Sequence, residues 1–81
     1  MKIVLASEDR NVIGYRVKSA RLDCKMTQEE LSAKLETLAV YIDRASISKL
    51  EQKKRIVTDI EILALSKILN VSINWLFELE K

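Results

Sequence analysis

Glycine and proline are nearly absent from this chain: Gly14 is the single glycine among 81 residues, and there is no proline. The tight turns that join β-strands rely on both residues, because glycine tolerates positive φ angles and proline pre-sets a turn. Loops that bind phosphate through backbone N–H groups need several glycines close together. The sequence therefore favours helices, disfavours a multi-hairpin barrel, and excludes P-loop and dinucleotide-binding sites.

Histidine is also absent, and Cys24 is the single cysteine. The usual ligand set of a zinc site is therefore missing, as are catalytic triads with a histidine base, and no disulfide can form within the chain. With 48% apolar and 32% charged residues, a chain of this length forms one small globular domain without room for a large catalytic cleft. We expect a protein that is not an enzyme and that uses no cofactor and no metal.

The apolar segments are short. The run at residues 3–6 is too short for a signal peptide, and no segment reaches membrane-spanning length. We therefore expect a cytoplasmic protein with no membrane partner.

Helical periodicity begins near Val12 and continues to about Cys24. Apolar residues recur there at i, i+4, i+7 and i+11, which places them on one face of a helix. Asn11 is a suitable N-cap, and Cys24 is expected in the core as a small apolar residue. The apolar face consists of Ile13, Val17, Ala20 and Cys24.

A second helix begins after Thr27, because Thr27 and Glu30 have the spacing of a capping box. Val40 and Ile42 are β-branched and weaken the helical pattern, so we expect the second helix to end before them. Its apolar residues are Leu31, Leu35 and Leu38.

The third predicted helix is short. Asp43 is a suitable N-cap, and Ile47 and Leu50 are the expected buried positions. The outer face is small, polar and basic, whereas a helix that covers the core would carry a wider apolar face.

Two helices complete the chain. Thr58 and Glu61 form a second capping box, Asn70 is suited to a left-handed residue that ends the fourth helix, and Ser72 caps the last one. The apolar stripe of the fourth helix is so broad that we expect it to be the central buried helix. That stripe comprises Ile60, Ile62, Leu63, Ala64, Leu65, Ile68 and Leu69, and the last helix contains Trp75, Leu76 and Leu79.

We divide the chain into an N-terminal arm, residues 1–11, and one helical domain, residues 12–81. For residues 1–10 the pattern leaves three possibilities open: a flexible arm, a short strand and an extension of the first helix. Short links between five helices leave no room for a second domain.

Basic residues are concentrated in two blocks, although the formal net charge is only +2. Residues 15–25 contain four basic residues and one acidic residue, and residues 43–55 contain five basic and two acidic residues. Segregated basic segments in a small helical domain are typical of nucleic-acid binding. A solvated, lysine-rich surface is the alternative, and charge alone does not decide between them.

Four segments together resemble the helix-turn-helix domains of phage repressors and Cro proteins. The resemblance covers about residues 12–79 and implies an all-α, five-helix, lambda-repressor-like bundle that contains a helix-turn-helix. The four segments are RVKSAR at Arg16–Arg21, MTQEEL at Met26–Leu31, SISKLE at Ser46–Glu51, and LSKILNVS at Leu65–Ser72 with Trp75 and Leu76 beyond it.

The resemblance implies a DNA interface. In such domains the third helix enters the major groove, and residues near its start contact base edges. Base contacts would then come from Arg44, Ala45, Ser46, Ser48 and Lys49. Phosphate contacts would come from Thr27 and Gln28 at the start of the second helix and from Lys53, Lys54 and Arg55 after the third. Gln28, Lys54 and Arg55 have ordinary surface roles as alternatives.

The resemblance also implies structural and dimer contacts. Arg21 and Glu51 occupy positions of an ion pair that links the first helix to the third. Ile73, Trp75 and Phe77 are candidates for a homodimer interface, with burial in the core as the alternative for Trp75. The chain differs from the family at Ala39 and Lys53, where glycine is common, and in a longer link between Leu35 and Asp43.

We therefore expect a sequence-specific regulator of transcription, a repressor, that binds double-stranded DNA as a dimer on an inverted repeat. An antitoxin or restriction-controller protein that regulates its own operon is one alternative. A protein-interaction module that keeps the fold without DNA affinity is the other.

Overall fold

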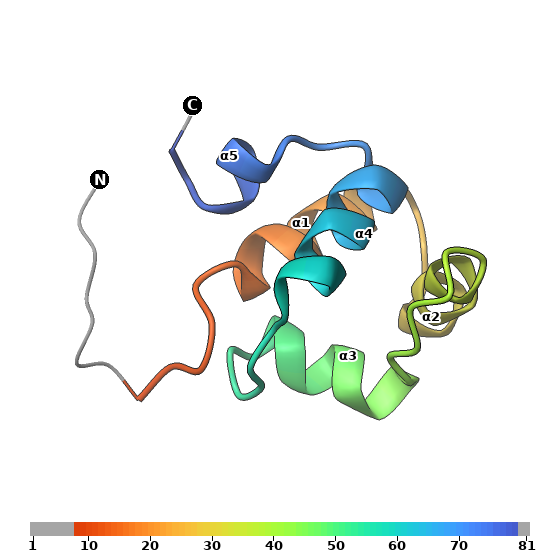
Figure 1. Ribbon diagram of the computed structural model, residues 1–81, viewed down its shortest axis with the longest axis horizontal. Helices are drawn as coiled ribbons and strands as arrows, with labels where there is room; N and C mark the ends of the chain where they lie inside the picture. Colours follow the sequence, from red (N-terminus) through yellow and green to blue (C-terminus); the bar gives the residue numbers. More distant parts are fainter. Residues whose placement is uncertain (1–7, 80–81) are drawn as a thin grey trace.

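The computed structural model describes residues 8–79, so the proposals for residues 1–7 lie outside the described residues. The described chain is all-helical, as predicted (Figure 1). α3 packs against α1 and α2, and α4 packs against α1, α2 and α5. In Figure 1, α3 lies at the lower end of the molecule and α5 at the upper end. The helices are α1 (Gly14–Asp23), α2 (Gln28–Glu36), α3 (Arg44–Glu51), α4 (Asp59–Leu69) and α5 (Ile73–Leu76).

Both predicted capping boxes are present. The hydroxyl of Thr27 accepts a hydrogen bond from the N–H of Glu30 at 3.0 Å, and the Glu30 carboxylate accepts from the N–H of Thr27 at 2.9 Å. These bonds hold the pKa of Glu30 below its usual value. Thr58 and Glu61 repeat the arrangement at the start of α4. Each box satisfies two backbone N–H groups that a helix start leaves without partners.

The other helix starts also use the predicted residues. Asp43 accepts from the N–H of Ser46 at 2.7 Å at the start of α3, and this bond lowers the pKa of Asp43. Ser72 caps α5. At α1, the Asn11 oxygen accepts from the N–H of Gly14 at 2.9 Å, although the regular helix begins only at Gly14, two residues later than predicted.

Helix ends depend on left-handed residues that are not glycine. Lys25, Ala39, Lys53, Asn70 and Glu78 all have φ angles between 57° and 62°, and each lies just beyond a helix. Asn70 was predicted in this role. The two positions at which the chain lacks a family glycine, Ala39 and Lys53, nevertheless keep the backbone conformation that glycine adopts most easily.

The core draws on every helix and on the link between α2 and α3. Val40 and Ile42 in that link are buried, and the Ser32 hydroxyl donates to the Ile42 carbonyl at 2.7 Å, so the long link contributes to packing. The buried apolar residues are Ile13, Val17, Ala20, Leu31, Leu35, Val40, Ile42, Ile47, Leu50, Ala64, Leu65, Leu69 and Leu76.

The prediction that α4 is the central buried helix is wrong. Ile60 is 67% exposed and Leu63 is 50% exposed, whereas Leu65 and Leu69 are buried. α4 lies in the middle of the view in Figure 1 and packs only one side, with Ala64, Leu65 and Leu69, against its neighbours α1, α2 and α5. Ile60 and Leu63 belong to another side of the same helix, so periodicity alone overestimated the buried face.

Three further residues differ from the prediction because helices end early. Cys24 is exposed rather than in the core, since α1 ends at Asp23 and the chain turns at Lys25. Leu38 lies beyond the end of α2 and is partly exposed, and Leu79 lies beyond the four-residue α5 and is exposed. Among the described residues, no helix combines the length and apolar character needed to span a membrane.

Candidate nucleic-acid interface

α3 has one buried face and one exposed face. Ile47 and Leu50 are completely covered by the rest of the domain, as the sequence predicted. The opposite face holds the residues expected to contact bases. Arg44, Ala45 and Lys49 are exposed, and Ser46 and Ser48 are half-buried.

Two of these residues already have polar neighbours. The guanidinium of Arg44 lies 4.0 Å from the Glu29 carboxylate on α2, and both side chains are largely exposed. Exposed ion pairs of this kind are weak, so Arg44 can leave Glu29 for another partner. The Ser48 hydroxyl accepts a hydrogen bond from the Gln52 amide at 3.0 Å.

A shallow hollow in the surface collects predicted contacts from three segments. Its volume is about 370 Å³, and it joins the start of α2, the outer face of α3 and the turn after α3. Residues expected to contact bases and residues expected to contact phosphates therefore share one surface. The hollow is lined by Gln28, Arg44, Ala45, Ser48, Lys49, Gln52 and Lys54.

Arg21 and Glu51 form the expected ion pair, and both are buried. The Arg21 Nε lies 2.7 Å from one Glu51 oxygen, and its Nη2 donates to the other at 3.1 Å. Arg21 also donates to the Met26 carbonyl at 2.8 Å, and the Gln28 amide donates to Glu51 at 3.1 Å. This network joins α1, the start of α2 and the end of α3.

The start of α2 is thus more constrained than its sequence suggests. Gln28 uses one N–H of its amide for Glu51. The Thr27 hydroxyl and N–H are both used in the capping box. A primary amide nitrogen carries two hydrogens, and a hydroxyl that accepts can still donate, so both side chains keep capacity for one phosphate contact.

The three basic residues after α3 are not equivalent. Lys54 is exposed. The Lys53 ammonium lies 4.4 Å from the centre of the Tyr15 ring. Arg55 makes two hydrogen bonds to the Glu61 carboxylate, at 3.0 and 2.9 Å, which raise the pKa of Arg55 and lower that of Glu61. The Arg55 charge is therefore compensated within the domain.

The candidates for a dimer interface also differ in exposure. Ile73 is 40% exposed, whereas Trp75 and Phe77 are half-buried and pack against the core. The Arg16 guanidinium stacks on the Trp75 ring at 4.4 Å and lies 3.8 Å from the Glu78 carboxylate.

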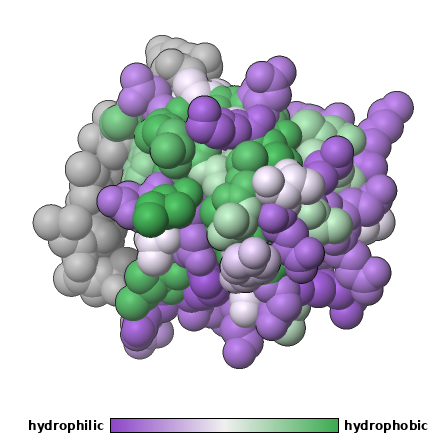
Figure 2. Space-filling model, turned by 45° about the vertical axis from the view of Figure 1, so that its right-hand side comes forward, coloured by the Kyte–Doolittle hydropathy of each residue, from purple (hydrophilic) through white to green (hydrophobic). Residues whose placement is uncertain are grey.

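Ile60 and Leu63 on α4 add exposed apolar surface that the sequence had assigned to the core. On the face drawn in Figure 2, most apolar surface lies in the left half.

The segment before α1 contacts the turn after α3, which the sequence did not indicate. Arg10 and Asn11 donate hydrogen bonds to backbone carbonyls of residues 50–55. The bonds span about forty residues of chain, so no local pattern could have identified them.

Comparisons with known proteins agree with this geometry. The structure of the P22 c2 repressor protein, in complex with synthetic operator 9T in the presence of Tl⁺, is similar to this chain with a TM-score of 0.72. The two chains are 24% identical, and the match covers 86% of this chain and 98% of the repressor chain. A search of curated proteins finds no match. Residues 17–76 match the helix-turn-helix family, so the chain belongs to that family.

Proposed function

We propose that this chain is a transcriptional repressor that binds a specific double-stranded DNA sequence as a dimer. The observation that carries the proposal is the outer face of α3. Arg44, Ala45 and Lys49 are exposed on a helix whose opposite side is fixed in the core. Surface of this composition, at the start of a short rigid helix, fits the major groove.

Base contacts come from the first two turns of α3. Arg44 can donate two parallel hydrogen bonds to the O6 and N7 atoms of guanine, and Ala45 can contact a thymine methyl group. Lys49 lies one turn further along the helix and can reach the next base pairs. The exposed pair between Arg44 and Glu29, at 4.0 Å, is weak, so it leaves Arg44 available to DNA.

Phosphate contacts come from both sides of α3. The exposed Lys54 follows the helix, and Thr27 and Gln28 lie at the N-terminus of α2, where the helix dipole favours an anion. Such contacts increase the affinity for DNA and make it depend on salt concentration. They do not select a base sequence, so sequence preference comes from α3. Arg55 contributes less than Lys54, because Glu61 compensates its charge.

A dimer follows from the limited reach of one domain. A single α3 contacts only a few base pairs, and each mismatch costs about 1–3 kcal/mol, so two copies on an inverted repeat are needed for useful specificity. The exposed apolar residues Ile73, Ile60 and Leu63 lie on α5 and α4, which are in contact with each other. Exposed apolar surface of this kind is what a second copy would cover, and its presence supports the proposed dimer.

Selection of bound sequences from random duplex DNA tests this function, followed by substitution of single residues. We expect Arg44→Ala to weaken the selected site by about 1–3 kcal/mol and to relax preference at one base position. Lys54→Ala should weaken all duplexes alike and flatten the salt dependence. Lys67→Ala, an exposed lysine at the end of α4, is the matched control and should change neither. Equal loss of base preference in the Arg44 and Lys54 variants contradicts the assignment.

The dimer is tested separately. Ile73→Asp should reduce binding to the full inverted repeat while the thermal unfolding midpoint stays near that of the parent, because Ile73 is partly exposed. Leu22→Asp, at a leucine on α1 that is 55% exposed, serves as the control and should leave binding unchanged. If the parent binds one half-site as tightly as the full repeat, dimeric recognition is wrong.

A further inference from the structure

The turn that follows α3, residues 52–55, is held by the segment that precedes α1. The Arg10 N–H donates to the Lys53 carbonyl at 2.8 Å. The Asn11 amide donates to the Leu50 carbonyl at 3.0 Å and to the Arg55 carbonyl at 2.8 Å. One side chain thus bridges the two ends of the turn.

Asn11 also ties this turn to α1. Its oxygen accepts from the N–H of Gly14. Gly14 lets the two segments approach, because a Cβ atom at this position would lie only 2.5 Å from the Leu50 carbonyl oxygen. The single glycine of the chain therefore lies where α1 meets the end of α3.

The adjacent aromatic residue orients one lysine of the turn. Tyr15 is 71% exposed, and the Lys53 ammonium lies 4.4 Å from the centre of its ring. Lys53 has a φ angle of 62°, a conformation that persists in a residue with a Cβ atom only when its surroundings hold it. The contacts from Arg10, Asn11 and Tyr15 are those surroundings.

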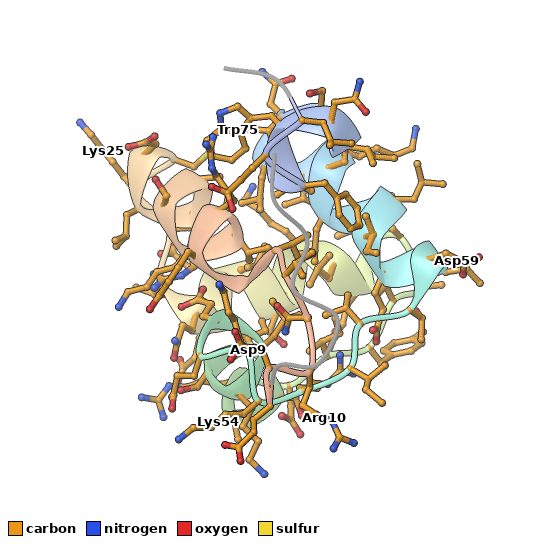
Figure 3. All side chains as sticks on the ribbon, turned by 90° about the vertical axis from the view of Figure 1, so that its left-hand side faces the viewer. Asp9, Arg10, Lys25, Lys54, Asp59 and Trp75 are labelled. Atoms are coloured by element: carbon orange, nitrogen blue, oxygen red, sulfur yellow. The ribbon has the colours of Figure 1, made fainter. Side chains whose placement is uncertain are left out.

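These contacts lie at the DNA-binding end of the molecule. Figure 3 shows Arg10 and Lys54 together at the end that holds α3, and Trp75 at the opposite end. Residues 10–15 precede the segment that matches the helix-turn-helix family, which begins at residue 17.

We propose that Asn11 and Tyr15 are positioning residues for phosphate binding by Lys53 and Lys54. Asn11 fixes the backbone of the turn, and Tyr15 holds the Lys53 ammonium beside it. A turn ordered before DNA binds loses less conformational freedom on binding, so its lysines contribute more to affinity. This inference rests on the proposed DNA-binding function and adds residues 10–15 to its interface.

Asn11→Ser tests the role of the amide. Serine keeps an oxygen that can cap α1 but lacks the amide nitrogen that bridges the turn. We expect weaker binding to every duplex alike, by about three- to tenfold, with unchanged base preference. The slope of log affinity against log salt should become shallower by about 0.9 for each phosphate that the variant no longer neutralises.

Double substitutions separate positioning from a general loss of structure. If Asn11 acts through the turn, Lys54→Ala should have little further effect in the Asn11→Ser variant, whereas Arg44→Ala should reduce affinity as much as it does in the parent. Tyr15→Leu removes the aromatic face at an exposed position without risk to the core. It should flatten the salt slope by up to about 0.9 and leave the unfolding midpoint unchanged.

The outcomes distinguish this inference from the proposed function. If the parent binds no duplex in a salt-dependent manner, both fail. If the parent binds but Asn11→Ser and Tyr15→Leu keep its salt slope, only the positioning role is wrong. The positioning role is also wrong if the affinity losses from Asn11→Ser and Lys54→Ala are fully additive. A changed base preference in the Asn11→Ser variant contradicts it as well.

Discussion

Ala39→Gly should stabilise the domain although it removes only a methyl group. Ala39 follows α2 with a φ angle of 59°, its side chain is exposed, and its N–H donates to the Glu36 carbonyl at 2.9 Å. An L-residue in this conformation costs about 1–2 kcal/mol that glycine avoids. Glycine loses about 0.5–1 kcal/mol more conformational entropy on folding than alanine. The net gain is about 0–1.5 kcal/mol, or up to roughly 12 °C in the unfolding midpoint of a domain this size.

The same chemical change at Ala33 is the matched control. Ala33 is also exposed but lies inside α2, where helical φ angles give glycine no advantage. Ala33→Gly should therefore destabilise by about 0.5–1 kcal/mol. Thermal unfolding followed by circular dichroism, at one protein concentration, measures both variants. If Ala39→Gly lowers the midpoint as Ala33→Gly does, the left-handed residue carries no strain and the reasoning is wrong.

Five other substitutions have defined outcomes. Leu65→Ala should cost about 2–5 kcal/mol in chemical unfolding and Leu63→Ala much less, because Leu65 is buried and Leu63 is half exposed; equal costs would contradict the assigned core. Gly14→Ala should destabilise by about 1–3 kcal/mol, since the new Cβ atom would meet backbone at 2.5 Å; an unchanged midpoint would mean that α1 can shift freely. Hydrogen bonds from Arg55 lower the pKa of Glu61 below 4.5, so this group stabilises the fold above about pH 4.5 and the stabilisation is lost as the pH falls further. The midpoint difference between the parent and Glu61→Gln should therefore shrink in acid, and a constant difference would refute this linkage. Glu29→Gln removes a carboxylate beside the DNA-binding face and should tighten binding to all duplexes at low salt, whereas weaker binding would show that Glu29 has a positive role.

Helix starts could be predicted from the sequence, and helix ends mostly could not. A start depends on a capping side chain within three residues, so Thr27, Asp43 and Thr58 could be identified locally. The ends of α2 and α3 rely on Ala39 and Lys53 in a left-handed conformation that neither residue prefers. Local backbone hydrogen bonds close these ends, from the Val40 N–H to the Leu35 carbonyl and from the Lys54 N–H to the Lys49 carbonyl. The residue types around them carry no signal for this conformation.

The buried side of α4 is a second feature that could not be predicted from the sequence. Its apolar residues cover nearly the whole circumference, so the sequence could not indicate which side packs against the bundle. The structure buries Leu65 and Leu69 and leaves Ile60 and Leu63 exposed. A helix that leaves part of its apolar surface exposed has the same sequence pattern as a fully buried helix, but only the exposed apolar surface can bind a partner.

The candidate interface also has some features that the sequence could predict and others that it could not. The exposed face of α3 could be predicted, because its residue types and position resemble the family. The pairing of Arg55 with Glu61 and the contacts of Asn11 could not, since they join residues across loops or about forty positions apart. Side-chain identity predicted which groups can bind DNA. The fold determines which of these groups already form contacts with other residues of the chain.

Polar contacts from α1, from the start of α2 and from the segment before α1 hold the end of α3 in place. The link between α2 and α3, residues 37–43, is long, and its length alone would allow α3 many orientations. Three polar contacts restrict them: Arg21 binds Glu51 in the last turn of α3, Gln28 binds the same carboxylate, and Asn11 binds the Leu50 carbonyl. A buried ion pair contributes little net stability, yet it is costly to break, so it selects one arrangement over others. Arg44, the proposed base contact, and Gln28 and Lys54, the proposed phosphate contacts, are thereby held on one surface.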